Sequence, residues 1–144
     1  MAHTTLIIDD DPTQRRLLEA VIAKMGHTTL VADGGVAAVD ILQSPKGAAI
    51  DLIMLDLVMP EMDGFAVLDR VKGICPHVPV IVLTAQGGIE TVVSAMRAGA
   101  VDFFVKPASP ERIKVGIENA LKIRALQGEI RRLSKRQTNE MSFD

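Results

Sequence analysis

Five short apolar runs, each followed by polar residues and then by a helical pattern, constrain this chain more than any other feature. Residues 52–55 and 80–83 are apolar without alternation, which is typical of strands buried on both faces of a sheet. Strands that alternate with helices pair in parallel, and their right-handed crossovers place helices on both faces. We therefore expect a doubly wound α/β fold around a five-stranded parallel sheet. The predicted strands cover residues 6–8, 28–32, 50–55, 79–83 and 101–105.

Helix boundaries follow from capping residues and from the spacing of apolar side chains. Asp11 is the expected N-cap of the first helix, Pro12 suits its first turn, and Gly26 ends it. The last helix is expected to begin near Pro110 and to run to about Arg136, beyond the compact domain. The other predicted helices cover residues 35–43, 65–73 and 89–98, and residues 44–47 are expected to form a loop.

Composition fits one compact domain and excludes several classes of protein. The chain has 144 residues, of which 48% are hydrophobic but only 3% aromatic, so its core must be aliphatic. A net charge of −2 argues against a protein that coats nucleic acid. The single cysteine, Cys75, cannot form an internal disulfide, which fits a reducing compartment. Since no apolar stretch is long enough for a membrane span or an export signal, we expect a cytoplasmic protein.

Polar side chains stand at the ends of four of the five predicted strands. Asp9 and Asp10 follow the first strand, and Asp56 follows the third. Thr84 follows the fourth strand, and Lys106 follows the fifth. Open parallel sheets bind ligands at the edge where the carboxyl ends of the strands meet. The sequence therefore predicts one site built from these side chains.

The chemistry of this site follows from its charges. Carboxylates packed together repel one another unless a cation lies among them, and oxygen ligands of this kind suit Mg²⁺. A lysine and a hydroxyl beside them can neutralise and hydrogen-bond the oxygens of a phosphoryl group during its transfer. Asp56 is the candidate nucleophile because it stands alone at the end of a central strand, which leaves Asp9 and Asp10 to hold the metal.

Four short motifs occur in order along the chain. They are Ile8-Asp9-Asp10, Leu55-Asp56 with Met59-Pro60 and Gly64, Leu83-Thr84-Ala85, and Gly99-Ala100 with Asp102-Phe103 and Lys106-Pro107. With these motifs, residues 6–122 resemble the receiver domain of two-component response regulators, a flavodoxin-like fold. The resemblance implies a signalling switch that accepts a phosphoryl group from a sensor histidine kinase and alters an output domain. Such a domain catalyses only its own phosphotransfer and dephosphorylation, so it is not expected to act as an enzyme on another substrate.

The resemblance also implies a role for each residue of the site. Asp56 is the expected phospho-acceptor, and Lys106 would contact the phosphoryl oxygens. The expected Mg²⁺ ligands are Asp10 directly, Asp9 mainly through a water, Asp56, and the backbone carbonyl of Val58.

Thr84 and Phe103 are the expected switch residues. The resemblance implies that Thr84 moves toward the phosphoryl group and that Phe103 turns inward behind it. On residue type alone, Thr84 also suits a strand. Phe103 and Phe104 alternate across the last strand, so one of them faces the core whichever acts as the switch. The peptide bond between Lys106 and Pro107 is expected to be cis.

The segment after residue 121 differs from the rest of the chain in charge and periodicity. It carries six Lys and Arg residues against three acidic ones. Its apolar residues alternate in spacings of three and four, as in the seam of a coiled coil, which favours a weak homodimer through the C-terminal helix. A solvated coiled-coil face explains the basic charge better than direct contact with DNA. The seam residues are Ile123, Leu126, Ile130 and Leu133.

We expect residues 1–122 to form the receiver domain, 123–137 a helical linker, and 138–144 the start of a downstream domain. The segment Met141-Ser142-Phe143-Asp144 resembles the point at which the ATPase domain of nitrogen-regulator-like, sigma-54-dependent activators begins. This resemblance implies a regulator of transcription whose ATPase and DNA-binding parts lie outside the present chain.

Two other function classes use a comparable parallel sheet. A Mg²⁺-dependent phosphatase of the haloacid-dehalogenase type also has an aspartate nucleophile. Enzymes that resemble this type share a second aspartate two positions after the nucleophile. This chain has Val58 at that position. A flavin carrier would place a phosphate beside acidic strand ends that repel it unless Mg²⁺ is present. Signal reception is therefore the main expectation, with the aspartate-nucleophile phosphatase as the alternative.

Overall fold

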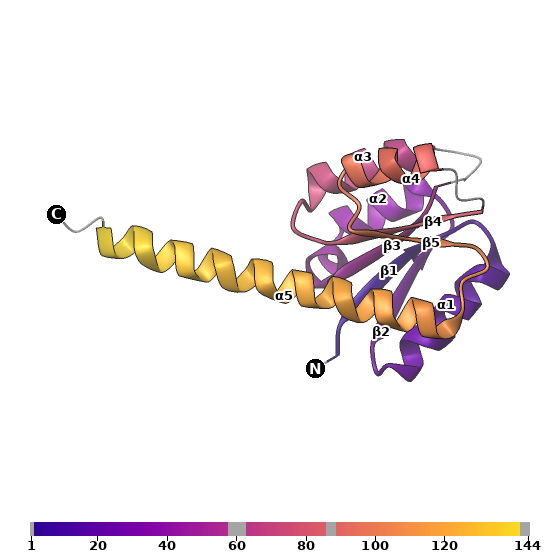
Figure 1. Cartoon of the computed structure of the whole chain (residues 1–144), viewed down its shortest axis with the longest axis horizontal. Coiled ribbons are helices and arrows are strands. Elements are labelled where there is room, and N and C mark those ends of the chain that lie inside the picture. Colours follow the sequence, from indigo (N-terminus) through magenta and orange to yellow (C-terminus); the bar gives the residue numbers. More distant parts are fainter. Residues whose placement is uncertain (1, 58–62, 86–88, 142–144) are drawn as a thin grey trace.

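A computed structural model gives the arrangement of the chain in space (Figure 1). It describes residues 2–57, 63–85 and 89–141, and the side chains of the last helix as far as residue 125. The strands are β1 (Thr4–Ile8), β2 (Thr28–Ala32), β3 (Leu52–Asp56), β4 (Val80–Thr84) and β5 (Asp102–Val105). The helices are α1 (Pro12–Lys24), α2 (Gly35–Gln43), α3 (Gly64–Ile74), α4 (Ile89–Arg97) and α5 (Pro110–Met141), with a short 3₁₀ helix, η1, at Pro45–Ala49.

The five strands form one parallel sheet in the order β2-β1-β3-β4-β5. The chain winds outward from β1 in both directions, so β1 and β3 lie side by side at the point where the strand order reverses. Pairing between Ile8 and Leu55, and between Asp56 and Leu83, brings the ends of these strands level. The predicted doubly wound, flavodoxin-like fold is confirmed.

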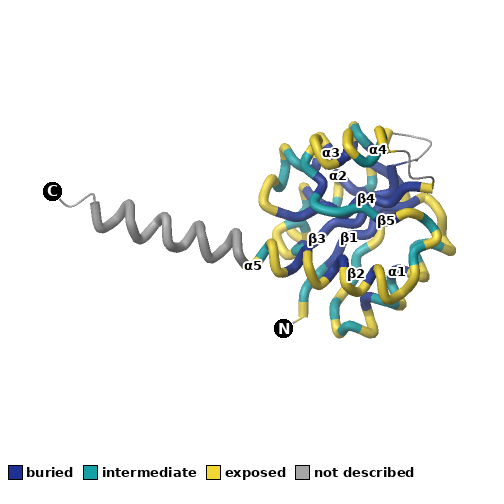
Figure 2. The backbone as a smooth tube through the Cα atoms, viewed as in Figure 1, coloured by how far each residue is buried: buried dark blue, intermediate teal, exposed yellow. Residues whose placement is uncertain are grey.

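The sheet separates two hydrophobic cores. Helices α1 and α5 cover one face, and α2, α3 and α4 cover the other (Figure 1). Along β1, Leu6 and Ile8 pack on the α2-α3-α4 side, whereas Ile7 packs on the α1-α5 side. Every residue of β3 and β4 is buried, as Figure 2 shows for the centre of the sheet. The residues of α5 that face the sheet are Ile113, Ile117, Ala120 and Leu121, as predicted.

The first helix begins and ends as the capping pattern predicts. The carboxylate of Asp11 accepts a hydrogen bond from the backbone N–H of Thr13 at 2.9 Å. Gly26 follows the helix with a φ of +84°, a left-handed conformation that glycine adopts without steric cost. Local chemistry therefore sets both ends of the helix that follows Asp9 and Asp10.

Several element boundaries differ from the predicted ones; for example, β1 begins at Thr4 rather than at residue 6, and β4 ends at Thr84 rather than at residue 83. Strand β3 begins at Leu52 rather than at residue 50, because Asp51 turns its carboxylate to the N–H of Thr4 at 3.0 Å. The predicted loop after α2 contains η1, whose first turn is capped by the hydroxyl of Ser44 on the N–H of Lys46. Helix α5 ends at Met141 rather than near residue 136. Among the described residues, no helix combines the length and apolar character needed to cross a membrane.

Candidate functional site

The predicted strand-end residues lie together at the carboxyl edge of the sheet. Asp9 follows β1, Asp56 is the last residue of β3, and Thr84 is the last residue of β4. Lys106 follows β5, and its backbone N–H donates to the carbonyl of Thr84 at 2.8 Å. Parallel pairing therefore converts four separated sequence positions into one site, as the sequence predicts.

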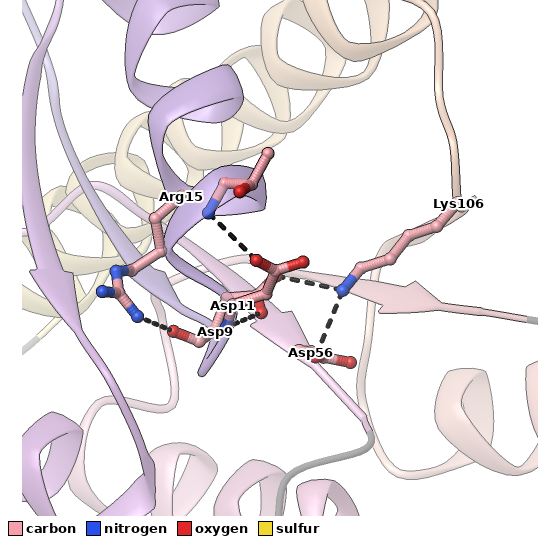
Figure 3. A network of polar contacts seen from close by, with 6 residues as sticks. Asp9, Asp11, Arg15, Asp56 and Lys106 are labelled. Atoms are coloured by element: carbon pink, nitrogen blue, oxygen red, sulfur yellow. Dashed lines mark hydrogen bonds and ion pairs between the residues drawn. The ribbon is translucent and has the colours of Figure 1, made fainter.

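Lys106 joins two carboxylates at the centre of this site. Its ammonium group donates to Oδ2 of Asp9 at 3.1 Å and to Oδ2 of Asp56 at 3.2 Å (Figure 3). Asp9 is fully buried and Asp56 is 5% exposed. Burial alone would lower the pKa of Lys106, but its hydrogen bonds and its attraction to the two carboxylates outweigh burial and raise that pKa above its ordinary value. The lysine therefore stays charged and neutralises part of the acidic cluster.

Asp9 is held by its own chain as well as by Lys106. Its Oδ1 accepts a hydrogen bond from the N–H of Asp11 at 3.0 Å, so both carboxylate oxygens have donors. Its backbone carbonyl accepts a hydrogen bond from Nη1 of Arg15 at 2.8 Å (Figure 3). Arg15 thereby ties the first turn of α1 to the end of β1. The sequence gives no pattern that identifies this arginine, because the contact depends on how α1 leaves the strand.

Three carboxylates form a cluster suited to a divalent cation. Among the described residues, Asp9, Asp10 and Asp56 each offer an oxygen, and these oxygens lie within 4.8 Å of one another. Oxygen ligands from carboxylates suit a hard cation such as Mg²⁺. Asp10 is exposed while the other two are buried, so the cluster opens to solvent on one side. One lysine cannot balance three carboxylates, and the donor set therefore fits the predicted metal.

Gly64, the first residue of α3, lies against Leu57, the residue that follows β3. The N–H of Leu57 donates to the carbonyl of Leu83 at 3.0 Å, and the N–H of Gly64 donates to the carbonyl of Leu57 at 3.2 Å. A Cβ atom at position 64 would lie 2.3 Å from Cα of Leu57, which no side chain tolerates. Gly64, which belongs to the second sequence motif, therefore permits close backbone approach near Asp56.

The profile of the family described as "Response regulator receiver domain" matches residues 5–118. The chain belongs to this family. The chain is 34% identical over 116 residues to the transcriptional regulatory protein ZraR of Escherichia coli strain K12. The aligned region covers 81% of this chain and 26% of ZraR. The chain is also 34% identical over 128 residues to the regulatory protein AtoC of the same organism, covering 89% and 27% of the two chains.

A solved structure shares both the fold and the sequence of the receiver domain. NtrX from Brucella abortus superposes with a TM-score of 0.85 and 34% identity, over 92% of this chain and 30% of that one. The chain thus spans about a quarter of the length of the curated relatives it matches. The shared part is their receiver domain, a signalling domain of two-component regulators of transcription.

The expected switch residues of the receiver domain occupy neighbouring strands. Thr84 is 2% exposed at the end of β4 and pairs with Val105 of β5. Phe103 is partly buried against the α2-α3-α4 core, and Phe104 lies 1% exposed in the opposite core. The predicted alternation of these two rings is confirmed.

Two further site predictions have different outcomes. The peptide bond between Lys106 and Pro107 is cis, as predicted. Val58, the predicted carbonyl ligand, lies outside the described residues.

Proposed function

We propose that this receiver domain is a phosphorylation-activated switch in which Asp56 accepts a phosphoryl group from a sensor histidine kinase in the presence of Mg²⁺. The observation that carries the proposal is the placement of Asp56. It is a buried carboxylate at the end of a central strand, with Lys106 at 3.2 Å and two further carboxylates able to share a cation with it. This combination offers a nucleophile together with the positive charge that a phosphoryl group requires.

Each residue of the site has a separate role in the transfer of the phosphoryl group. A carboxylate oxygen of Asp56 forms the new bond to phosphorus while the bond from phosphorus to the kinase histidine breaks, and the released imidazole takes up a proton. Lys106, already beside Asp56, moves its hydrogen bond to a phosphoryl oxygen. Asp9, Asp10, Asp56 and the carbonyl of Val58 would hold Mg²⁺, whose charge offsets that of the phosphoryl oxygens. Thr84 and Phe103 then change position together and pass the signal on.

The output lies in a longer cytoplasmic protein of which this chain is the receiver part. The chain covers only about a quarter of ZraR and AtoC, one of which is a transcriptional regulatory protein by name. We place the receiver domain at 1–122 before a helical linker, 123–137, that pairs with a second copy through its apolar seam. Residues 138–144 then begin an ATPase domain of the sigma-54-dependent type. The basic residues of the linker lie on the solvated face of the coiled coil and do not contact DNA directly.

Intact-protein mass measures phosphoryl acceptance directly. After incubation with acetyl phosphate, the wild-type chain is expected to gain one phosphoryl group with Mg²⁺ and none when the metal is chelated. Asp56→Asn should gain none under either condition. Asp51→Asn is the matched control, since Asp51 lies at the opposite end of β3, and it should behave as the wild type. An adduct that survives in Asp56→Asn, or that forms without Mg²⁺, would contradict the proposal.

A further inference from the structure

We propose that Arg112 is a positioning residue that couples β5 to α5, so that a change at the phosphorylation site reaches the C-terminal helix. This inference rests on the proposed function, because it names the path by which that switch transmits its signal. Arg112 lies in the first turns of α5 and contacts three consecutive residues of β5, namely Asp102, Phe103 and Phe104. We call these four residues together with Gly116 the β5–α5 clamp.

The polar half of the clamp fixes the guanidinium group to the strand. Nη2 of Arg112 lies 3.0 Å from Oδ1 of Asp102, and Nη1 lies 3.4 Å from Oδ2 of the same carboxylate. Nη2 also donates to the backbone carbonyl of Phe103 at 3.1 Å. The N–H of Phe103 in turn donates to Oδ1 of Asp102 at 2.8 Å. The arginine therefore holds both a side chain and the main chain of β5.

The apolar half of the clamp places the guanidinium of Arg112, whose side chain is 43% exposed, over a ring of the core. The guanidinium carbon lies 4.8 Å from the centre of the Phe104 ring, which is a cation–π geometry. Gly116, one turn further along α5, makes room for that ring. A Cβ atom there would lie 2.4 Å from Cζ of Phe104 and 3.2 Å from Nη1 of Arg112. The ring, the glycine and the guanidinium are therefore packed against one another, so a shift of β5 would act on α5 through these contacts.

The clamp and the phosphorylation site share one short strand. At its carboxyl end, β5 leads to Lys106, which contacts Asp56 and Asp9 and hydrogen-bonds the backbone of Thr84. At its centre, β5 is held by Arg112 through Phe103, the expected switch aromatic. Phosphorylation of Asp56 changes the partner of Lys106 at one end of the strand, and Arg112 carries the resulting displacement into α5. This is a contiguous set of contacts between the acceptor and the helix that leaves the domain.

The contacts require an arginine rather than any cation. A planar guanidinium can pair with a carboxylate, hydrogen-bond a carbonyl and lie over an aromatic ring at once, whereas the ammonium group of a lysine is a point charge. Arg112→Lys therefore keeps the charge of α5 and removes the geometry. Lys114→Ala is the control on the same helix, because Lys114 faces a groove toward α1 rather than the clamp.

The test compares amide hydrogen exchange in α5 before and after phosphorylation by acetyl phosphate and Mg²⁺. Intact mass first establishes that wild type, Arg112→Lys and Lys114→Ala gain the phosphoryl group equally. We expect the phosphorylation-dependent change in exchange of α5 amides to fall about threefold or more in Arg112→Lys, the scale on which such contacts alter coupling. Lys114→Ala should keep the full change. A merely structural role would raise exchange equally in both states and leave their difference intact.

Each result decides the proposal. A wild-type response in Arg112→Lys, or phosphorylated wild type without any change in α5, overturns the coupling role while leaving the acceptor function standing. Absence of an adduct in the wild type overturns the proposed function, and the coupling role with it.

Discussion

The two ends of the parallel sheet both carry ionisable side chains, but these side chains are clustered and mostly buried at one end and partly exposed at the other. At the carboxyl end, three carboxylates cluster within 4.8 Å, and two of them are buried around Lys106. At the amino end, His3 lies 3.4 Å from Asp51, with each side chain about one-third exposed. One end thus concentrates carboxylates away from water, and the other leaves a single carboxylate beside a histidine, both in contact with water.

The polar groups of the amino end satisfy one another and the backbone. The N–H of His3 donates to Nδ1 of His27 at 3.1 Å, and the N–H of Thr4 donates to Asp51 at 3.0 Å. These contacts tie the beginnings of β1, β2 and β3 together. Burying unbalanced charge costs free energy, so a fold tolerates it where a ligand supplies the missing charge. The comparison therefore separates a ligand site from a structural one.

Removal of Lys106 tests the carboxyl end most strongly. Lys106→Met deprives buried Asp9 and Asp56 of their shared cation, and we expect the free energy of unfolding to fall by about 3–5 kcal/mol without divalent metal, as for other broken buried pairs. In Mg²⁺ the loss should shrink, because the metal neutralises the same carboxylates. Urea unfolding with and without Mg²⁺ measures both values. A loss that is identical in the two conditions would show that these carboxylates do not take up the cation.

Mg²⁺ itself should stabilise the wild-type chain. At a concentration ten times the dissociation constant, a cation that binds only the folded state adds about 1.4 kcal/mol. The gain should disappear in Asp10→Asn, which removes the exposed carboxylate of the cluster, and persist in Asp51→Asn. Thermal unfolding over a Mg²⁺ titration provides the measurement. Equal gains in the two variants would place the metal elsewhere.

Loss of the charge of Asp51 at the amino end should lower the free energy of unfolding much less than loss of Lys106. Asp51→Asn keeps an oxygen that can accept the hydrogen bond from the N–H of Thr4 and changes only a partly exposed contact with His3. We expect a loss below about 1 kcal/mol, as for other solvent-exposed pairs. Urea unfolding alongside Lys106→Met gives the direct contrast. Equal losses in the two variants would break the distinction between the two ends.

The smallest expected effect is a pH dependence at His27. Burial, and after it the charges of His3 and the N-terminus, lower the pKa of His27 below its ordinary value of 6.5. The folded state therefore favours the neutral ring, which also accepts the hydrogen bond from His3. This contribution is present above pH 6.5 and is lost as the pH falls through the lower folded-state pKa. Between pH 7.5 and 5, stability should decline more steeply in the wild type than in His27→Gln, and parallel curves would exclude this contribution.

The carboxyl-end site could be predicted in large part because its residues are the ends of strands. An apolar run that stops at Asp9, Asp56 or Lys106 marks both a strand boundary and a position at the ligand-binding edge. Parallel topology then brings these positions together without knowledge of any side-chain contact. For the same reason the doubly wound parallel sheet, its covering by helices on both faces and the sheet-facing residues of α5 follow from the pattern.

Contacts that depend on how packed elements meet could not be predicted. Arg15 reaches the carbonyl of Asp9, and Arg112 reaches the carbonyl of Phe103, from helices whose angle to the sheet no local pattern encodes. Gly64 belongs to a sequence motif and Gly116 lies inside the predicted last helix, but only the neighbouring Leu57 and Phe104 explain why glycine stands at these positions. At the amino end, His3 and His27 have no spacing that indicates their contact, because β-sheet pairing brings them together.

The most direct test of the central claim is to locate the phosphoryl group on the chain. The wild-type protein is phosphorylated with acetyl phosphate and Mg²⁺, the acyl phosphate is reduced with borohydride, and the reduced residue is identified by peptide mass spectrometry. We expect the reduced side chain to be that of Asp56, and Asp9, Asp10 and Asp51 to remain unmodified. Modification of another aspartate, or of none while Mg²⁺ is bound, would contradict this expectation.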